Sequence, residues 1–439
     1  MARDLRAEYR AKLVTIDDVL GMIRSGEVLR AGGNACRPVC LYQNLHKLAG
    51  KVENVMVFPT AAFFGSYPFA TDPAMAGCVT IASTFHDDLA RAGQKLGLAS
   101  YVPNHLHNGT PKTLEAYGID KYFLTVSAMD DNGYFRFSLD NISELEYIRY
   151  AKEHGRQVIV EVNPNMPLTF GETELPIDWV DYIVEVDQPL LSIPDIPLSG
   201  DEKAIGQHVA ELVEDGSTIQ LGFGGIPNAV AAFLDTKNDL GVHSEMITSN
   251  MAELAKAGVI TGRRKTLHWG KMVGNFSLGT PALYQFLHNN PTVMILRGAY
   301  VNDPHIIAQN YRMVSINAAI QVDLTGQICS ESIGTMQYSG TGGATDFAVG
   351  ASHSVGGKSI VALKSTAKKG TISTIQPVLS PGSVVSISRN DIDYVVTEYG
   401  AAKLRGYRIQ ERVEHLLAVC HPKFRDELRS QAKELGIIW

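Results

Sequence analysis

The sequence lacks several features that mark whole classes of protein. Its five cysteines are an odd number at unrelated spacings, which argues against a disulfide framework. No apolar run approaches the roughly 20 residues that a membrane helix needs. The first ten residues mix acids and bases and lack the apolar core of a signal peptide. We therefore expect a soluble protein of the cytoplasm, with no membrane partner.

Charge of one sign is also scarce in any single stretch. The net charge of −7 is spread without a basic block, so nucleic-acid binding has little support. An apolar fraction of 45% with 19% charged residues is that of an ordinary folded chain. At 439 residues the chain exceeds what one compact core normally holds, which predicts two domains.

Common catalytic and cofactor motifs are missing as well. A scan finds no Gly-x-Ser-x-Gly nucleophile elbow in a strand-to-helix setting, and no Gly-Lys-Ser/Thr follows the glycine turn at 222–225 as it would in a P-loop. His105 and His107 form a His-x-His pair without a further ligand cluster, so we expect no metal. Cys329 is a possible nucleophile, but a buried apolar thiol is the favoured interpretation.

The most informative stretch is a glycine turn near the middle of the chain. It runs from an apolar strand at 219–221 to a helix expected to begin behind Pro227. Such a turn points free backbone N–H groups at one spot, which suits phosphate or another anion, although the motif alone also fits an ordinary tight turn. The candidate anion-binding residues are Gly222, Phe223, Gly224, Gly225 and Ile226.

A single carboxylate ends the next apolar strand. Glu245 stands in His-Ser-Glu-Met, at the position where the open edge of an α/β sheet normally holds its reacting groups. His243 is interpreted as a neighbour that only orients it. The order of the two stretches predicts that a phosphate-bearing ligand meets a carboxylate.

The two halves of the chain follow the same plan. Helix, glycine-containing turn, strand, glycines, proline and helix occur at residues 24–38 and again at 214–227, and comparable strands follow at 54–58 and 240–245. We interpret this as a diverged internal duplication. Largely apolar strands fit sheets covered by helices on both faces. The predicted fold class is α/β, with two similar doubly wound open-sheet domains and the active site in the cleft between them.

A proline-rich segment separates the halves. Three prolines lie between residues 187 and 200 and forbid regular structure there. The expected organisation is an N-terminal domain at 1–188, a linker at 189–204 and a C-terminal domain at 205–439 that carries Glu245.

Two further stretches are candidates for function. The glycine-rich segment 339–347 either lays backbone N–H groups against a ligand or forms a surface loop. Glu398 is a second carboxylate at a strand end, and the favoured interpretation is an ion pair with Lys403 or Arg405 rather than chemistry.

The motifs occur in one order that resembles the acetyl-CoA hydrolase/transferase family. They are the glycine turn, His-Ser-Glu-Met, Ser-Gly-Thr-Gly-Gly and Val-Val-Thr-Glu-Tyr-Gly. Within the family, the 4-hydroxybutyrate and butyryl-CoA:acetate CoA-transferases are most similar. The resemblance covers nearly the whole chain and implies two similar α/β domains and a homodimer. It also implies that coenzyme A enters as acyl-CoA, with small carboxylic acids as the other substrates.

The resemblance also assigns individual residues. Glu245 matches the family's catalytic glutamate, and Asn302 matches an asparagine near the thioester. The resemblance implies coenzyme A contacts for the glycine turn and for Ile320, Gly342 and Gly343.

The chain departs from the family pattern at two places. Ala344 replaces a common glutamine, and the segment 63–69 has no clear counterpart, so the identity of the acyl group stays open. A glutamyl-CoA thioester on Glu245 is the expected intermediate of transfer. Hydrolysis of acyl-CoA and non-catalytic acyl-CoA binding are the alternatives.

Overall fold

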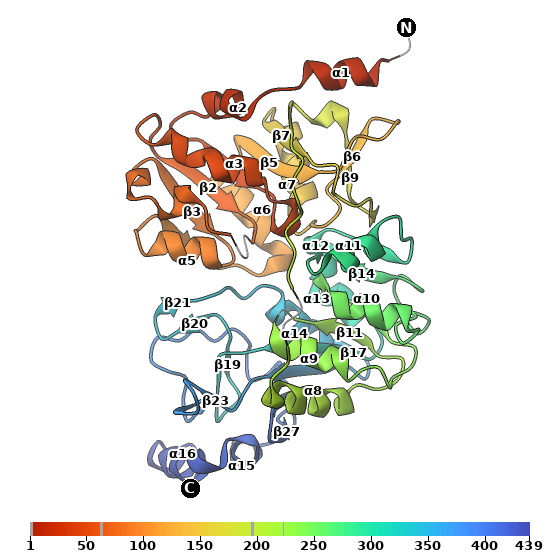
Figure 1. Cartoon of the computed structure of the whole chain (residues 1–439). Coiled ribbons are helices and arrows are strands. Elements are labelled where there is room, and N and C mark those ends of the chain that lie inside the picture. Colours follow the sequence, from red (N-terminus) through yellow and green to blue (C-terminus); the bar gives the residue numbers. More distant parts are fainter. Residues whose placement is uncertain (1–2, 62–64, 195–196, 223) are drawn as a thin grey trace. The chain divides into compact units, whose positions relative to one another are not determined.

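The computed structural model describes residues 3–61, 65–194, 197–222 and 224–439 and divides into two compact units (Figure 1). The first unit comprises Met1–Ile193 and Asn275–Tyr300, and the second comprises Pro194–Gly274 and Val301–Trp439. The chain thus returns to the first unit after it has begun the second. The domain limits expected from the sequence remain a prediction.

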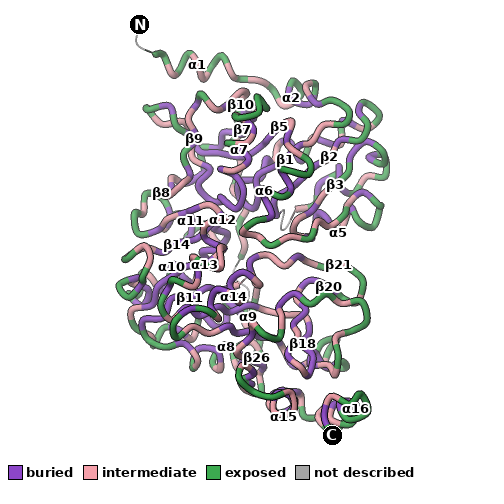
Figure 2. The backbone as a smooth tube through the Cα atoms, turned by 180° about the vertical axis from the view of Figure 1, so that it is seen from behind, coloured by how far each residue is buried: buried purple, intermediate pink, exposed green. Residues whose placement is uncertain are grey.

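The first unit is built on a parallel sheet of seven strands. Central strands are buried along nearly their whole length, as the apolar sequences predict for a sheet covered on both faces (Figure 2). Across the sheet the strands are β10 (Tyr182–Glu185), β7 (Gln157–Val162), β5 (Lys121–Val126), β1 (Val28–Ala31), β2 (Val55–Pro59), β3 (Val79–Ser83) and β4 (Ala99–Tyr101).

Helices and short strands complete the first unit. The helices are α1 (Leu5–Ala11), α2 (Ile16–Met22), α3 (Val39–Asn44), α4 (Pro68–Thr71), α5 (Asp88–Gln94), α6 (Leu106–Tyr117), α7 (Glu144–Glu153) and α11 (Pro281–Leu287). The short strands are β6 (Tyr134–Arg136), β8 (Phe170–Gly171), β9 (Glu174–Pro176), β15 (Phe276–Ser277) and β16 (Val293–Ile295). Strand β16 pairs with β8 and thereby brings the returning segment into this unit.

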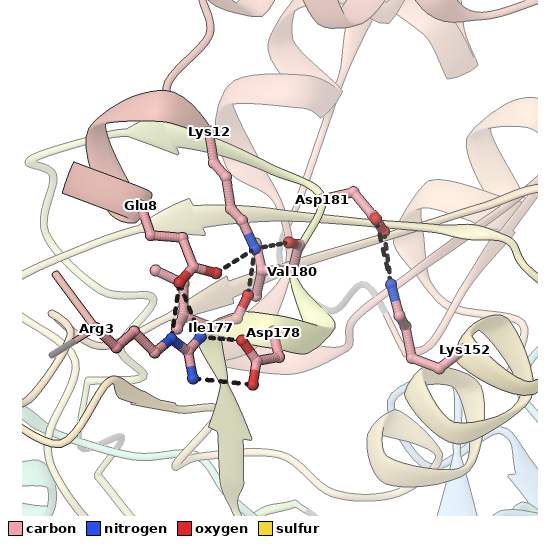
Figure 3. Close-up of polar contacts among 8 residues, drawn as sticks. All are labelled: Arg3, Glu8, Lys12, Lys152, Ile177, Asp178, Val180 and Asp181. Atoms are coloured by element: carbon pink, nitrogen blue, oxygen red, sulfur yellow. Dashed lines mark hydrogen bonds and ion pairs between the residues drawn. The ribbon is translucent and has the colours of Figure 1, made fainter. Parts of the chain in front are cut away.

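Polar contacts fasten the N-terminal helix α1 to the first unit (Figure 3). The ammonium group of Lys12 donates to the carbonyl oxygens of Ile177 at 2.7 Å and Val180 at 2.8 Å. Arg3 forms an ion pair with Asp178. Because both contacts reach the segment just before β10, they tie α1 to the edge strand of the sheet.

The second unit repeats the strand order of the first. In each sheet the unit's first strand lies inside, the strands that come next in sequence follow on one side, and the later strands follow in sequence on the other. This shared topology agrees with the predicted duplication and α/β class. The strands lie in the order β27 (Gly400–Lys403), β26 (Tyr394–Thr397), β22 (Lys358–Ala362), β17 (Met313–Ala318), β11 (Thr218–Leu221), β12 (Gly241–His243) and β14 (Met272–Gly274). Only β27 runs antiparallel to its neighbour in this set.

The helices of the second unit surround this sheet. They are α8 (Gly200–Leu212), α9 (Gly225–Ala232), α10 (Ser249–Lys256), α13 (Pro304–Ala308), α14 (Ala344–His353), α15 (Ile409–Val419) and α16 (Arg425–Glu434), and α12 (Gly298–Val301) crosses from the first unit. The prediction that α9 begins behind Pro227 is wrong, because it begins at Gly225. Pro227 is accommodated because the first-turn N–H groups of a helix have no intrahelical partner.

Short strands outside the main sheet complete the second unit. They are β13 (Met246–Ile247), β18 (Gln321–Asp323), β19 (Ile328–Cys329), β20 (Ser332–Ile333), β21 (Met336–Gln337), β23 (Thr366–Ala367), β24 (Ile372–Ser373) and β25 (Ile375–Gln376). A search of the described helices finds none with the length and apolar character required to cross a bilayer.

In the first unit, the glycine turn after β1 is already engaged within the protein. The backbone N–H of Gly33 donates to the carboxyl group of Glu144 at 3.1 Å, and the Asn34 side-chain amide donates to Asp140 at 2.6 Å. Both carboxyl groups are buried, and burial raises the pKa of each. The turn that corresponds to the predicted anion site of the second unit therefore uses its N–H group for internal structure.

Candidate active site

Glu245 lies just beyond the carboxyl end of β12. The strand runs between β11 and β14, so its end belongs to the edge of the sheet where parallel α/β proteins bind ligands. Ser244, between the strand and Glu245, donates its backbone N–H to the carbonyl of Val273 at 3.0 Å. That bond fixes the backbone immediately before the carboxylate.

Two hydrogen-bond donors converge on the Glu245 carboxylate. The Asn302 side-chain amide donates to Oε2 at 3.0 Å, and the backbone N–H of Gly343 also donates to the carboxylate. A Cβ atom added at position 343 would overlap both Glu245 Oε2 and Asn302 Nδ2. Only glycine leaves room for this three-residue arrangement, and Glu245, Asn302 and Gly343 are three of the site residues expected from the sequence.

Burial sets the protonation of Glu245. Removal from water raises the pKa of its carboxyl group to about 7, and the nearby charge of Asp346 raises the pKa further. The bonds from Asn302 and Gly343 oppose that rise, because they stabilise the charged form. Near neutral pH the side chain exchanges readily between acid and carboxylate, and the carboxylate is more basic than an exposed one.

We expect this pKa to appear in the pH dependence of the reaction. A nucleophilic Glu245 must be deprotonated, so kcat/KM for an acyl-CoA should fall as the pH drops below about 7 and level off above it. Initial rates over a range from about pH 5 to pH 9 measure the profile. A rate that stays flat through neutrality would contradict the assignment of Glu245 as the attacking group.

The glycine turn occupies the end of β11, the strand beside β12. Gly222 donates its N–H to the carbonyl of Ile316 at 2.8 Å, and a Cβ there would lie 2.9 Å from Asn317 Oδ1. Gly224 has φ of 124°, which disfavours any other residue, and Gly225 and Ile226 begin α9. Phe223, also expected to bind coenzyme A, lies outside the described residues.

Two buried side-chain amides next to the turn are hydrogen-bonded to each other. The side chains of Gln220 on β11 and Asn317 on β17 bond reciprocally, at 3.0 and 3.1 Å. Beside the turn, the Glu202 carboxylate lies close to Gly225 and pairs with Lys364 at 3.3 Å. The local charge is therefore balanced, and the sequence reasoning had not identified any of these four residues.

The remaining predicted contacts flank the site. Ile320 is half-buried after β17 and donates its N–H to the Cys329 carbonyl at 2.9 Å. Gly342 has φ of 53° and directly precedes Gly343. In the described part of the chain, polar contacts join Glu245 to Asn302 and Gly343 but not to Ile320 or the glycine turn.

A buried glutamate holds the glycine-rich segment that delivers Gly343. The Glu331 carboxylate accepts hydrogen bonds from the hydroxyl groups of Thr341 at 3.0 Å and Ser386 at 2.8 Å. Its backbone carbonyl accepts the N–H groups of Tyr338 and Ser339. The segment is thus an internally bonded loop, and no sequence motif had marked Glu331.

The interpretation of Glu398 as the partner of Lys403 or Arg405 is wrong. Its carboxylate accepts the backbone N–H of Ser365 at 2.9 Å and also the Ser365 hydroxyl. Because β27 turns back antiparallel to β26, Lys403 lies opposite Tyr394 at the other end of the pair, and Arg405 pairs with Asp393 at 2.9 Å.

Cys329 is buried, as the favoured interpretation held. Its thiol donates to the carbonyl of Ser332 at 3.3 Å. In the described residues, no group of three or more His, Cys, Asp or Glu side chains is placed to hold a metal ion.

Two family models match most of the chain. The acetyl-CoA hydrolase/transferase N-terminal domain matches residues 1–194, and the C-terminal domain of the same family matches residues 279–432. A parallel sheet that presents a carboxylate at a strand end is an arrangement found in many α/β enzymes. The chain belongs to the acetyl-CoA hydrolase/transferase family.

Similar proteins with named activities cover nearly the full chain. The 4-hydroxybutyrate coenzyme A transferase of Clostridium kluyveri is 49% identical over 97% of this chain and 98% of its own. The succinyl-CoA:cyclohexane-1-carboxylate CoA transferase of Geobacter metallireducens is 41% identical over 99% and 98%. The crystal structure of RipA from Yersinia pestis matches with a TM-score of 0.93 at 38% identity, over 99% of this chain and 100% of that one. The enzyme class expected from the sequence, a CoA-transferase, is that of the two curated relatives.

Proposed function

We propose that the protein transfers coenzyme A between a short-chain acyl-CoA and a carboxylic acid through a thioester on Glu245. The main support is the Glu245 carboxylate itself, which is buried, bonded by Asn302 and Gly343, and shifted in pKa to about 7. A group with these properties suits nucleophilic attack better than an exposed glutamate does.

The reaction proceeds as two exchanges at the glutamate. The Glu245 carboxylate attacks the thioester carbonyl of the donor, the carbon–sulfur bond breaks, and a mixed anhydride and a thiolate form. The thiolate then attacks the Glu245 side-chain carbonyl carbon and expels the donor acid as a carboxylate. The acceptor carboxylate reverses both steps on the resulting thioester. Bonds broken and formed are of the same kinds, so no ATP is needed.

Asn302 and Gly343 serve the intermediates on the glutamate. Both already bond the side-chain carboxylate, and Asn302 bonds Oε2. When thiolate or carboxylate attacks the side-chain carbonyl carbon, negative charge develops on an oxygen in reach of these donors. Donors that are in place before the reaction need no reorganisation, and each is worth about 3 kcal/mol of barrier.

Binding of the part of coenzyme A that is remote from the thioester supplies further free energy for catalysis. Gly225 and Ile226 present first-turn backbone N–H groups at the start of α9, which suits a phosphate. Energy from that contact, spent on orienting the thioester against Glu245, raises the rate as well as the affinity. Acyl-CoA is a substrate here, and the scheme needs no metal.

The names of the relatives narrow the choice of acids. The Clostridium kluyveri enzyme is named for 4-hydroxybutyrate and the Geobacter metallireducens enzyme for succinyl-CoA and cyclohexane-1-carboxylate. We infer that 4-hydroxybutyrate, succinate and cyclohexane-1-carboxylate are the first acids to test, together with the acetate and butyrate that the family resemblance implies. A panel of acyl-CoA donors against acids, with products identified by mass spectrometry, assigns the pair. A homodimer, expected from the family resemblance, is checked by light scattering.

Trapping the intermediate tests the proposal directly. Borohydride added with an acyl-CoA donor should reduce the glutamyl thioester to an alcohol, inactivate the enzyme and modify position 245 in a peptide digest. Matched samples without donor, and the Glu245→Ala variant with donor, should stay unmodified. Protection by the donor, or modification elsewhere, would contradict the covalent scheme. Consumption of donor without any acceptor acid would indicate a hydrolase.

A further inference from the structure

His243 is a buried side chain with one defined hydrogen bond. Its Nε2 atom lies 2.9 Å from the carbonyl oxygen of Val301. A carbonyl oxygen can only accept, so Nε2 carries the hydrogen. Nδ1 is buried and has no hydrogen-bond partner. Burial, helped by the charge of Lys265, lowers the pKa of this histidine to about 3, so the ring is neutral.

This ring contacts the segments next to Asn302 and Gly343. It belongs to β12, two residues before Glu245. The carbonyl that it bonds is part of the peptide group that joins Val301 to Asn302. The ring also packs against Phe347 of α14, at 6.2 Å between centroids, and Phe347 donates its N–H to the Gly343 carbonyl at 2.9 Å.

We propose that His243 is a positioning residue, whose Nε2–H holds the Val301–Asn302 peptide so that the Asn302 amide meets the Glu245 carboxylate. Because the peptide group is planar, a bond that holds its carbonyl also holds the N and Cα atoms of the next residue, from which the Asn302 side chain extends. The proposal deepens the proposed function, because Asn302 is one of the two donors that serve the glutamate.

If position 243 needed only a side chain that fills the space, an apolar ring would be more favourable than histidine. Leaving Nδ1 buried without a partner is unfavourable, and an apolar ring of similar size would avoid that cost. What the apolar ring lacks is the donor to Val301. The charged groups near the site have other neighbours than His243 Nδ1. Lys265 donates to the carbonyls of Val242 and Lys271. His268 lies near Lys265, and Asp346 lies near Glu245.

The test compares variants with and without a donor at position 243. His243→Phe and His243→Met remove the donor, whereas His243→Gln places an amide nitrogen near the position of Nε2. The readout is the pH dependence of carbodiimide labelling at Glu245, followed in a peptide digest. Because the bond from Asn302 lowers the pKa of Glu245, the donor-free variants should label up to a higher pH than the wild type. The glutamine variant should label like the wild type.

A double variant separates positioning from a general effect on folding. In the Asn302→Ala background the bond to Glu245 is already lost, so His243→Phe should add no further shift. Equal shifts in both backgrounds, or no shift in the donor-free single variants, would overturn the proposal. If His243→Phe does not fold, His243→Met provides the same comparison.

Kinetics give a second readout of the same proposal. Misplacing Asn302 should lower kcat by up to about 100-fold and leave KM for acyl-CoA nearly unchanged, with recovery in His243→Gln. Labelling needs no turnover. A failure of the transferase proposal, seen as activity retained by Glu245→Ala, is therefore distinguishable from a failure of the role of His243.

Discussion

Replacing Glu245 by alanine is expected to abolish coenzyme A transfer, with a loss of roughly four orders of magnitude or more in kcat. The reason is that Glu245 is the carboxylate to which Asn302 and Gly343 are bonded. Without this side chain no residue carries coenzyme A between the two acids. Direct attack of an acid on the thioester would also lack the hydrogen bonds that Asn302 and Gly343 give to Glu245. Rates of acyl-CoA formation from a second acid measure the loss.

A matched surface variant controls for the loss of a glutamate as such. Glu253 on α10 is 65% exposed at its side chain and pairs with Lys256 on the same helix, so Glu253→Ala should keep full activity. Retention of a substantial fraction of transfer by Glu245→Ala would remove Glu245 from the mechanism.

The Glu245 variant should also change the pH dependence of stability. Burial raises the pKa of Glu245 in the folded state to about 7, so its contribution to stability is present below the ordinary value of 4.5 and is lost as the pH rises through about 7. The stability of Glu245→Gln should lack this dependence on pH, so the variant should be more stable than the wild type above neutral pH. Thermal unfolding at several pH values measures the difference. Equal melting curves for the two proteins would indicate that Glu245 is solvated rather than buried.

Replacing Gly343 by alanine is expected to produce the second-largest loss. The residue has φ of −90°, which alanine adopts without strain, so the whole effect must come from contact. The new methyl group would overlap Glu245 Oε2 and Asn302 Nδ2 and would lie 3.2 Å from the Glu245 carboxyl carbon. One methyl group thereby disturbs both donors, and we expect kcat to fall by about 100-fold or more.

Gly200→Ala is the control for this substitution. Position 200 begins α8 in the same unit, and a Cβ there would meet nothing within 4 Å. Its activity and melting temperature should match those of the wild type. Full activity in Gly343→Ala would show that the site relaxes around the methyl group, and that the glycine is not required by the geometry of Glu245.

Local patterns predicted the framework of the site well. The apolar strand that ends at His243, followed by Glu245, marked the carboxylate because parallel strands expose their carboxyl ends at one edge. Repeated helix, turn and strand signals revealed the duplication, which the two strand orders share. Asn302 and Gly343 came from family resemblance alone, since neither an isolated asparagine nor a glycine loop indicates what it faces.

Contacts between distant segments escaped prediction for a physical reason. His243 and Val301 are 58 residues apart, and Glu398 bonds Ser365 because of how β26 and β27 turn, which no local pattern encodes. Glu331 belongs to no sequence motif, and its role follows from the hydrogen bonds that it accepts from distant hydroxyl groups. The early start of α9 at Gly225 reflects how readily a first turn accepts glycine and proline.

The return of Asn275–Tyr300 to the first unit limits how the protein can be divided into separately expressed fragments. A fragment that stopped at the proline-rich connection would lack the strand β16 that pairs with β8. One continuous piece of the sequence therefore does not contain the whole first unit, although the two units share a topology.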